Sequence, residues 1–196
     1  MQTEGVEEAG AFFQRFWFKC DLKWRYVNTT SKRADSDIRR QFQWAANTWM
    51  SAINQNLPKP AILTLTEVTG NNEEADIKLG FLQKRHGDNK PFDSGPLNEF
   101  AHAFYPFVTK DKKLHGSIHF DNEERWGNSG DGDILPFIAL HEFGHALGLP
   151  HATIKNSVMY PSIDSSTTFK IRRLFEADIT NIRNLYPFRL CDLFSG

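Results

Sequence analysis

The sequence predicts one domain of the α+β class, in which helices pack against a mixed sheet of five strands. Its 196 residues are enough for a single domain with a hydrophobic core of its own. Apolar residues make up 40% and charged residues 24% of the chain, a balance typical of soluble globular proteins. Strand-like and helix-like periodicities follow one another in the order β-α-β-β-β-β-α-α, which favours stacked layers of sheet and helix.

The first half of the chain is predicted to form a strand, a long helix and two more strands. Residues 22–27 and 75–81 alternate between apolar and polar side chains, and 62–68 is rich in strand-forming residues. Asp35 or Ser36 is suited to cap a helix after the first strand. The apolar side chains of that helix fall on one face: Ile38, Phe42, Ala45, Ala46, Trp49 and Ile53.

The middle of the chain alternates between loops and short strands. Residues 83–98 show little apolar periodicity and contain prolines and glycines, so we expect a long loop there. Long loops in compact domains usually carry function. Strands are expected over 100–105 and 116–120, followed by a second loop over 128–133.

Two helices are predicted in the last third of the chain. The first spans 134–147, with Pro136 tolerated in its opening turn and Gly148 suited to a left-handed cap at its end. The second spans 174–185. Its apolar side chains share one face: Phe175, Ile179, Ile182 and Leu185.

Charge and hydropathy exclude two classes of function. The formal net charge is -1, so nucleic-acid binding has no electrostatic support, and the apolar stretches are too short to cross a bilayer. Residues 1–10 are acidic and polar, unlike a signal peptide. Two explanations are therefore open: the protein is intracellular, or the sequence is an excised piece of a longer chain to which Met1 was added. Cys20 and Cys191 are compatible with one disulfide or with two thiols.

The segment from His141 to His151, HEFGHALGLPH, carries the chemistry. His141 and His145 are four residues apart on a predicted helix, so their imidazoles project from one face and can share a metal ion. Gly148 permits a turn that returns His151 as a third ligand, and Glu142 can reach a metal-bound water. Three neutral imidazoles and a water form the open coordination of catalytic zinc. Three unrelated histidines are a poor alternative, because this spacing arises by chance at about 5 in 100,000 positions.

The motif HExxHxxGxxH resembles the zinc-binding signature of the metzincin endopeptidases, and Met159 resembles the methionine of their conserved turn. Among metzincins the chain is most similar to the matrixins, the catalytic domains of matrix metalloproteinases. Pro161 stands where astacin-like and serralysin-like members carry a tyrosine. Ala152 stands where adamalysin-like members carry an aspartate and matrixins usually a serine or threonine. The resemblance implies a metzincin fold: a twisted five-stranded sheet packed on two helices, with a third helix at the C-terminal end.

Matrixins also bind a structural zinc ion through a His-x-Asp pair and two later histidines. By resemblance the ligands here are His86, Asp88, His102 and His119. Three imidazoles and one carboxylate complete a closed tetrahedral site. Six of the seven histidines then have a metal role and only His115 has none. The alternative, loop and strand histidines that make ordinary hydrogen bonds, stays open.

The resemblance further implies at least one calcium ion, for which hard oxygen ligands are suited. The implied ligands are side-chain oxygens of Asp93, Asp121 and Glu124 and backbone carbonyls of Gly95, Leu97 and Glu99. The alternative is a set of ordinary solvated acids. A further calcium site of the family is expected to be impaired, because Ser117 stands where an aspartate is expected, although Asp76 matches the other ligand.

By resemblance the chain is a zinc-dependent endopeptidase acting on extracellular or matrix-type proteins through a metal-activated water, with Glu142 as general base. Ala101 and Ala103 are expected on a sheet edge that pairs with an extended substrate. Phe137 is expected to line the primary pocket, unless it belongs to the core, and Pro161 begins the outer wall. Two other classes of function remain open. One is a catalytically silent metzincin fold used as a binding module, and the other is a structural protein that bound metal ions stabilise. The intact motif disfavours the silent module.

The resemblance divides the chain into three parts. They are an N-terminal tail or pro-segment remnant (1–20), a matrixin-like catalytic domain (21–188) and a C-terminal tail (189–196). Expected partners are protein or peptide substrates, and protein inhibitors of matrixins are candidates, with no nucleic acid and no membrane span. The protein is expected to be a monomer. Secretion to the extracellular space is implied by the resemblance alone.

Overall fold

The computed structural model describes residues 15–55, 57, 62–70, 73–92, 99–127, 133–162 and 170–187. Within these ranges the chain forms five strands and three α-helices in the predicted order, with a short 3₁₀ helix at Lys112–Leu114 in addition. The predicted α+β fold of five strands and three helices is thereby confirmed. None of the described helices is long and apolar enough to cross a membrane.

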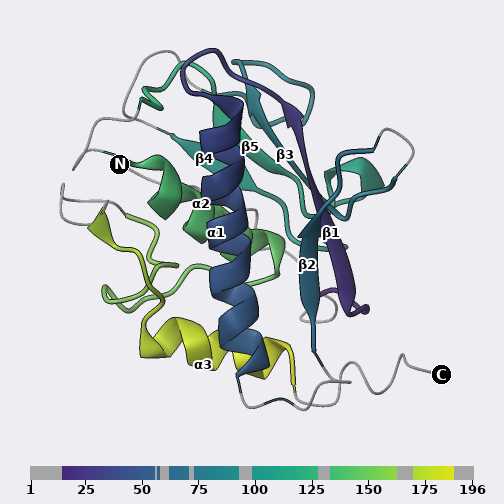
Figure 1. Ribbon diagram of the computed structural model, residues 1–196, viewed down its shortest axis with the longest axis vertical. Helices are drawn as coiled ribbons and strands as arrows, with labels where there is room; N and C mark the ends of the chain where they lie inside the picture. The colour runs from purple at the N-terminus through teal and green to yellow at the C-terminus, as the bar shows by residue number, and fades with distance from the viewer. Residues whose placement is uncertain are drawn as a thin grey trace.

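The five strands form one mixed sheet in the order β2-β1-β3-β5-β4 (Figure 1). Their bounds are β1 Asp21–Asn28, β2 Thr64–Glu67, β3 Ile77–Leu82, β4 Ala101–Ala103 and β5 Ile118–Asp121. The pairs β1–β2, β1–β3 and β3–β5 are parallel, and β4 is antiparallel to β5. The short strand β4 therefore forms one edge of the sheet.

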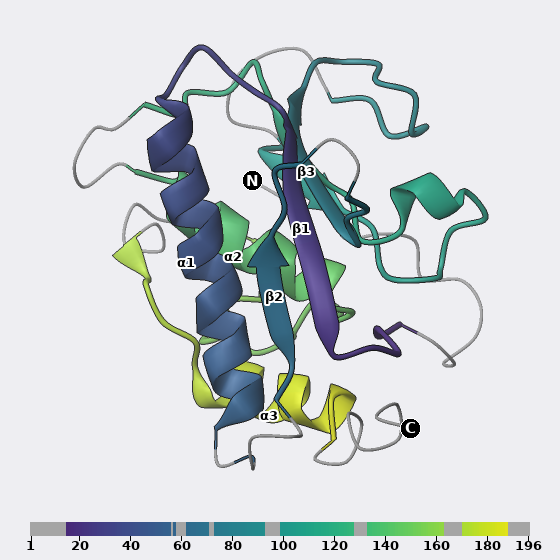
Figure 2. The same cartoon turned by 45° about the vertical axis from the view of Figure 1, so that its right-hand side comes forward.

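Helices α1 (Asp35–Asn54) and α2 (Leu135–Ala146) pack on one side of the sheet, and α3 (Glu176–Leu185) crosses the lower end of α1 (Figures 1 and 2). A hydrogen bond of 2.8 Å from the Trp49 indole nitrogen to the Leu140 carbonyl links α1 to α2. The rings of Trp24 on β1 and Phe143 on α2 meet edge to face, with centroids 6.4 Å apart. Helix α2, which carries the HEFGH segment, thus packs against both α1 and the sheet.

The buried face of α1 is the one that the sequence predicts, because all six of its expected apolar side chains are buried. The predicted cap is wrong. Ala34 occupies the N-cap position without a side-chain cap, and Asp35 already lies in the first turn. Asp37 of that turn instead forms ion pairs with Arg33 and Arg40. Acidic residues in the first turn stabilise the helix through its dipole, which offsets the missing cap.

The segment before β1 packs against the end of α2. Trp17 is only 5% exposed, and its indole nitrogen donates to the Ala146 carbonyl at 2.9 Å. The Tyr186 hydroxyl donates to the Leu147 carbonyl at 2.8 Å and accepts a hydrogen bond from the Trp17 amide at 3.2 Å. These bonds satisfy carbonyls that a helix end leaves without intrahelical partners. Trp17 falls within the range 1–20 that was expected to be a tail.

Candidate metal centres

Two histidines of α2 face each other across one helical turn. The Nε2 atoms of His141 and His145 are 3.0 Å apart, and both side chains are fully buried. The ring of His151 lies 5.4 Å from that of His141 and 4.7 Å from that of His145, centroid to centroid. One nitrogen from each of the three rings lies within 4.8 Å of the other two. The three imidazoles expected to form the open site are therefore brought together.

Gly148 makes the turn that returns His151 to the helix. Its φ is +108°, in the region that favours glycine, and a β-carbon there would overlap the carbonyl oxygen of Arg15. The Gly148 amide donates to the His145 carbonyl at 2.8 Å, and the Leu149 amide to the Gly144 carbonyl at 2.9 Å. These two bonds close the end of the helix in the way that the sequence predicts for this glycine.

The hydrogen bonds of His141 and His145 define where their protons lie. His141 Nδ1 donates to the Val158 carbonyl at 2.6 Å, and His145 Nδ1 donates to the Leu149 carbonyl at 2.7 Å, because a carbonyl can only accept. Burial lowers the pKa of His141 to about 3 and that of His145 well below its usual value, so both rings are neutral. Their Nε2 atoms then present lone pairs to each other. Facing lone pairs require a cation between them, so this site fits a metal ion.

Glu142 follows the first of these histidines and is 1% exposed. Both of its carboxylate oxygens are buried without a hydrogen-bond partner among the described residues. Burial raises the pKa of Glu142 to about 8, while the nearby His102 lowers it and Glu99 raises it. A buried and unpartnered carboxylate is costly to the fold, which marks it as a candidate for chemistry.

Met159 lies beneath the helix, in a turn that an acid of α3 holds in place. The Ala152 amide donates to the Met159 carbonyl at 2.8 Å. Asp178, in the first turn of α3, accepts hydrogen bonds from the Ser157 hydroxyl and, at 3.0 Å, from the Val158 amide. Sequence reasoning missed Asp178. An acid in a first helical turn signals only a favourable dipole interaction, and nothing in the local pattern reveals the distant turn.

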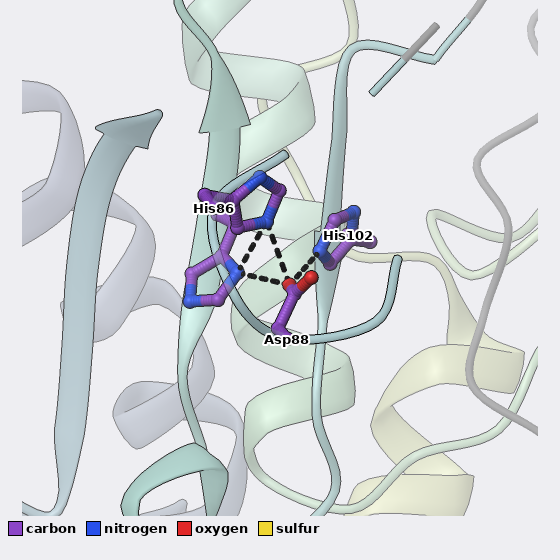
Figure 3. Close-up of side chains that lie close together, drawn as sticks. His86, Asp88 and His102 are labelled. Atoms are coloured by element: carbon purple, nitrogen blue, oxygen red, sulfur yellow. Dashed lines mark hydrogen bonds and ion pairs between the residues drawn. The ribbon is translucent and has the colours of Figure 1, made fainter. Parts of the chain in front are cut away.

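A second cluster forms around the carboxylate of Asp88 (Figure 3). Its Oδ2 lies 2.7 Å from His86 Nε2, 2.8 Å from His102 Nε2 and 2.7 Å from His119 Nδ1. Burial raises the pKa of Asp88, but hydrogen bonds from His102 and His119 outweigh it and hold that pKa well below its usual range. The four residues expected to form the closed site are brought within metal-binding distance.

The outer nitrogens of this cluster are also engaged. His86 Nδ1 donates to the Lys84 carbonyl at 2.9 Å, because a carbonyl can only accept. His102 Nδ1 lies 2.9 Å from an oxygen of Glu99. Burial lowers the pKa of His102, but hydrogen bonds to Asp88 and Glu99 raise it to about 9. Three imidazole nitrogens that converge on one carboxylate form the donor set of a tetrahedral zinc site, so this cluster fits a metal ion too.

The expected calcium ligands are only partly described. Asp93, Gly95 and Leu97 lie outside the described residues. Asp121 and Glu124 are both buried, at the end of β5 and just beyond it. The Glu99 side chain bonds to His102, which leaves its backbone carbonyl as the expected ligand.

The two residues of the further calcium site, which is expected to be impaired, bond to other groups of the protein. The carboxylate of Asp76 pairs with the Lys19 ammonium at 3.0 Å and accepts a 2.8 Å hydrogen bond from the Lys23 amide. The hydroxyl of Ser117 donates to the Lys113 carbonyl at 3.1 Å. An ammonium group thus supplies positive charge beside Asp76. His115, left without a metal role, bonds to the Thr109 carbonyl instead.

The expected substrate-binding residues lie on three different elements. Ala101 and Ala103 are on β4, the edge strand, with buried side chains. Phe137, in the first turn of α2, is 2% exposed and belongs to the hydrophobic core. Pro161 is partly buried and follows the Met159 turn by one residue.

A mixed sheet over two helices, with paired histidines on the second helix, a third after a glycine turn and a methionine turn beyond, matches the metzincin class of zinc metalloendopeptidases. A family model described as matrixin matches residues 16–187. The chain belongs to the matrixin family, whose members depend on zinc.

Named relatives agree with this family. The chain is 34% identical over 186 residues to neutrophil collagenase of Homo sapiens, covering 93% of this chain and 36% of that protein. It is 35% identical over 170 residues to matrix metalloproteinase-20 of Homo sapiens, covering 87% and 32%. It is 36% identical over 170 residues to matrix metalloproteinase-18 of Xenopus laevis, covering 87% and 33%. The chain therefore spans about a third of the length of these relatives.

Proposed function

We propose that the chain is the catalytic domain of a zinc-dependent endopeptidase that hydrolyses peptide bonds of extracellular or matrix-type proteins. The observation that carries the proposal is the buried, unpartnered carboxylate of Glu142, beside the facing lone pairs of His141 and His145. A protein retains such a carboxylate where it acts on water or substrate. The names of the relatives, a collagenase and two matrix metalloproteinases, support the same activity.

In this proposal His141, His145 and His151 hold the catalytic zinc. Bound zinc would supply Lewis acidity toward the scissile carbonyl and activate a water. Glu142 would be the general base that accepts a proton from water and delivers it to the leaving amine. The raised pKa of about 8 belongs to the zinc-free site, and the positive charge of a bound zinc ion would lower it toward the range that a general base needs. Met159 carries no proton to transfer, and its side chain forms the floor under the ligands.

The remaining metal ions would be structural. His86, Asp88, His102 and His119 would hold a second zinc ion with no open position, so it should exchange more slowly than the first. Asp121 and Glu124 would bind calcium together with Asp93 and backbone carbonyls of Gly95, Leu97 and Glu99. Asp121 and Glu124 are buried at the end of β5 and just beyond it, and their carboxylates are hard oxygen ligands of the kind that calcium prefers.

A peptide substrate would pair with β4 in extended form. Ala101 and Ala103 lie on this edge strand, and their small side chains allow a second strand to approach. The primary pocket would lie next to α2, with Pro161 at the start of its outer wall. Phe137 lies one turn before His141 but belongs to the hydrophobic core, so it would affect this pocket through packing behind its wall.

We place the catalytic domain at residues 21–188, with 1–20 and 189–196 as flanking segments. We expect the protein to be secreted and to meet protein inhibitors of matrixins. We also expect it to act as a monomer. The names of the relatives support an extracellular role, because collagenases act on a matrix protein.

The test is cleavage of a quenched peptide and of gelatin, with and without a zinc chelator. We expect activity that the chelator abolishes, that added zinc restores and that a hydroxamate inhibits. Glu142→Ala should reduce turnover by about 10²–10⁴-fold while retaining two zinc ions per chain. Glu74→Ala, at an exposed acid, is the matched control and should change neither. A silent binding module would cleave neither substrate, and a purely structural protein would not bind the hydroxamate.

A further inference from the structure

Glu99 lies on the side of His102 that faces away from the metal cluster. Its Oε1 is 2.9 Å from His102 Nδ1, while Nε2 of the same ring is 2.8 Å from Asp88 Oδ2 (Figure 3 shows the His102 ring edge facing Asp88). His102 is 1% exposed, and the rings of Phe92 and Phe104 flank it with centroids 4.8 and 5.7 Å away. The contact between Glu99 and His102 is therefore partly buried, where charges interact more strongly than they do in water.

A carboxylate in this position distinguishes His102 from other histidines of the two clusters. The outer nitrogens of His86, His141 and His145 each donate to a backbone carbonyl. A carbonyl fixes the proton on the outer nitrogen but carries no charge. A carboxylate does the same and also adds a full negative charge, which makes the imidazole a stronger ligand.

The charge of the closed site explains why a carboxylate would be useful there. A zinc ion bound by three neutral imidazoles and the single carboxylate of Asp88 leaves one positive charge among buried groups. Uncompensated buried charge is expensive. The carboxylate of Glu99, whose side chain is 21% exposed, supplies the missing negative charge on the protein side of His102.

We propose that Glu99 is a positioning residue of the closed zinc site. Its carboxylate accepts the Nδ1 proton of His102, holds the ring with the Nε2 lone pair toward the metal, and neutralises the zinc–Asp88 centre. This inference rests on the proposed zinc occupancy of the closed cluster. It concerns the side chain of Glu99 and is independent of the calcium role proposed for its backbone carbonyl.

The first test measures zinc release from the fully loaded protein into a coloured chelator, with calcium in excess. Two phases are expected, the faster from the open site and the slower from the closed site. Glu99→Gln should accelerate the slow phase by about 10–100-fold and leave the fast phase unchanged. Glutamine keeps the backbone carbonyl and nearly the same shape, so it removes only the charge. Glu99→Asp should restore part of the slow release, and Glu74→Gln, at an exposed acid, should change neither phase.

The second test needs no variant. In the zinc-loaded wild-type protein, nitrogen-15 spectra should show His102 as the Nδ1–H tautomer, with a slowly exchanging and strongly hydrogen-bonded proton. An Nε2–H tautomer would overturn the proposal. So would a slow phase in Glu99→Gln equal to that of Glu74→Gln, although two zinc ions per chain would then still support the closed site. A single zinc ion per chain in undialysed wild-type protein would instead remove the closed zinc site itself.

Discussion

The sulfur of Met159 fills the space beside Gly144 that a β-carbon would otherwise occupy. Gly144 lies on α2, directly before His145, where glycine costs about 1 kcal/mol of helix stability relative to alanine. Because that side chain is absent, the Met159 turn can press against the helix. The neighbouring Val158 carbonyl then accepts the Nδ1 proton of His141 at 2.6 Å. The close contact between helix and turn is thus coupled to the orientation of a proposed zinc ligand.

We predict that Gly144→Ala destabilises the zinc-loaded protein by about 1–3 kcal/mol. The added β-carbon would overlap the Met159 sulfur and lie 2.9 Å from Trp49 Cζ2, so the turn must move. Urea unfolding gives the free energy, and zinc retention reports the effect on the open site. Gly127→Ala is the matched control, because its β-carbon meets no atom within 4 Å. Equal stability of the two variants would contradict this prediction.

Asp178 should be a major stabilising residue of the same turn. It is buried, and its carboxylate accepts hydrogen bonds from Ser157, Val158 and the Phe175 amide. Asp178→Ala leaves these donors without their partner, and we expect a loss of roughly 2–4 kcal/mol in unfolding free energy. Thermal unfolding with calorimetry measures it. Glu176→Ala, an exposed acid in the same helical turn, should cost less than about 1 kcal/mol. If Asp178→Ala lost no more stability than Glu176→Ala, the turn would not depend on the Asp178 carboxylate.

Local patterns predicted the elements that depend on local rules. The buried face of α1 follows from residue spacing alone, and the spacing of His141 and His145 places them on one face of a helix whatever surrounds it. Gly148 was recognisable because few other residues suit its backbone conformation. The grouping of the histidines in the closed cluster came from family resemblance, not from spacing.

What the sequence did not reveal depends on partners far along the chain. Trp17 bonds to Ala146, 129 residues away, so its place in the core has no local signal. Strand β4 was expected over 100–105 but ends at Ala103. Pro106, which has no amide proton, limits any further pairing in that direction. Glu99 precedes His102 by only three residues. In an extended chain, side chains three residues apart point to opposite faces, so this spacing does not predict their contact.

The cysteines provide a separate prediction. Cys20 is disulfide-bonded, and the other cysteine of the sequence, Cys191, lies outside the described residues. We predict Cys191 as its partner. A crosslink around nearly the whole chain should stabilise by about 4–5 kcal/mol, or on the order of 10 °C in Tm. A reductant should lower the Tm of the wild type but not of Cys20→Ser. Two free thiols in the denatured, unreduced protein would rule the crosslink out.

The last prediction concerns the pH dependence that buried Glu142 imposes on the zinc-free protein. Burial raises its pKa from the model-peptide value of 4.5 to about 8. Between these two values the folded protein keeps a proton that the unfolded chain has released. The free energy of unfolding therefore falls as pH rises from about 4.5 to about 8, and this contribution is flat outside that window. Glutamine cannot titrate, so Glu142→Gln removes the contribution.

The measurement is urea unfolding of wild type and Glu142→Gln at several pH values from 5 to 8, after zinc removal by a chelator that spares calcium. The variant should gain stability relative to wild type as pH rises, and each unit of pKa difference is worth about 1.4 kcal/mol. We expect a relative gain on the order of several kcal/mol across the window. Histidine titrations are common to both proteins and largely cancel in the difference. Parallel stability curves would mean that the carboxylate finds water or a partner once the metal is gone, and that burial does not set its pKa.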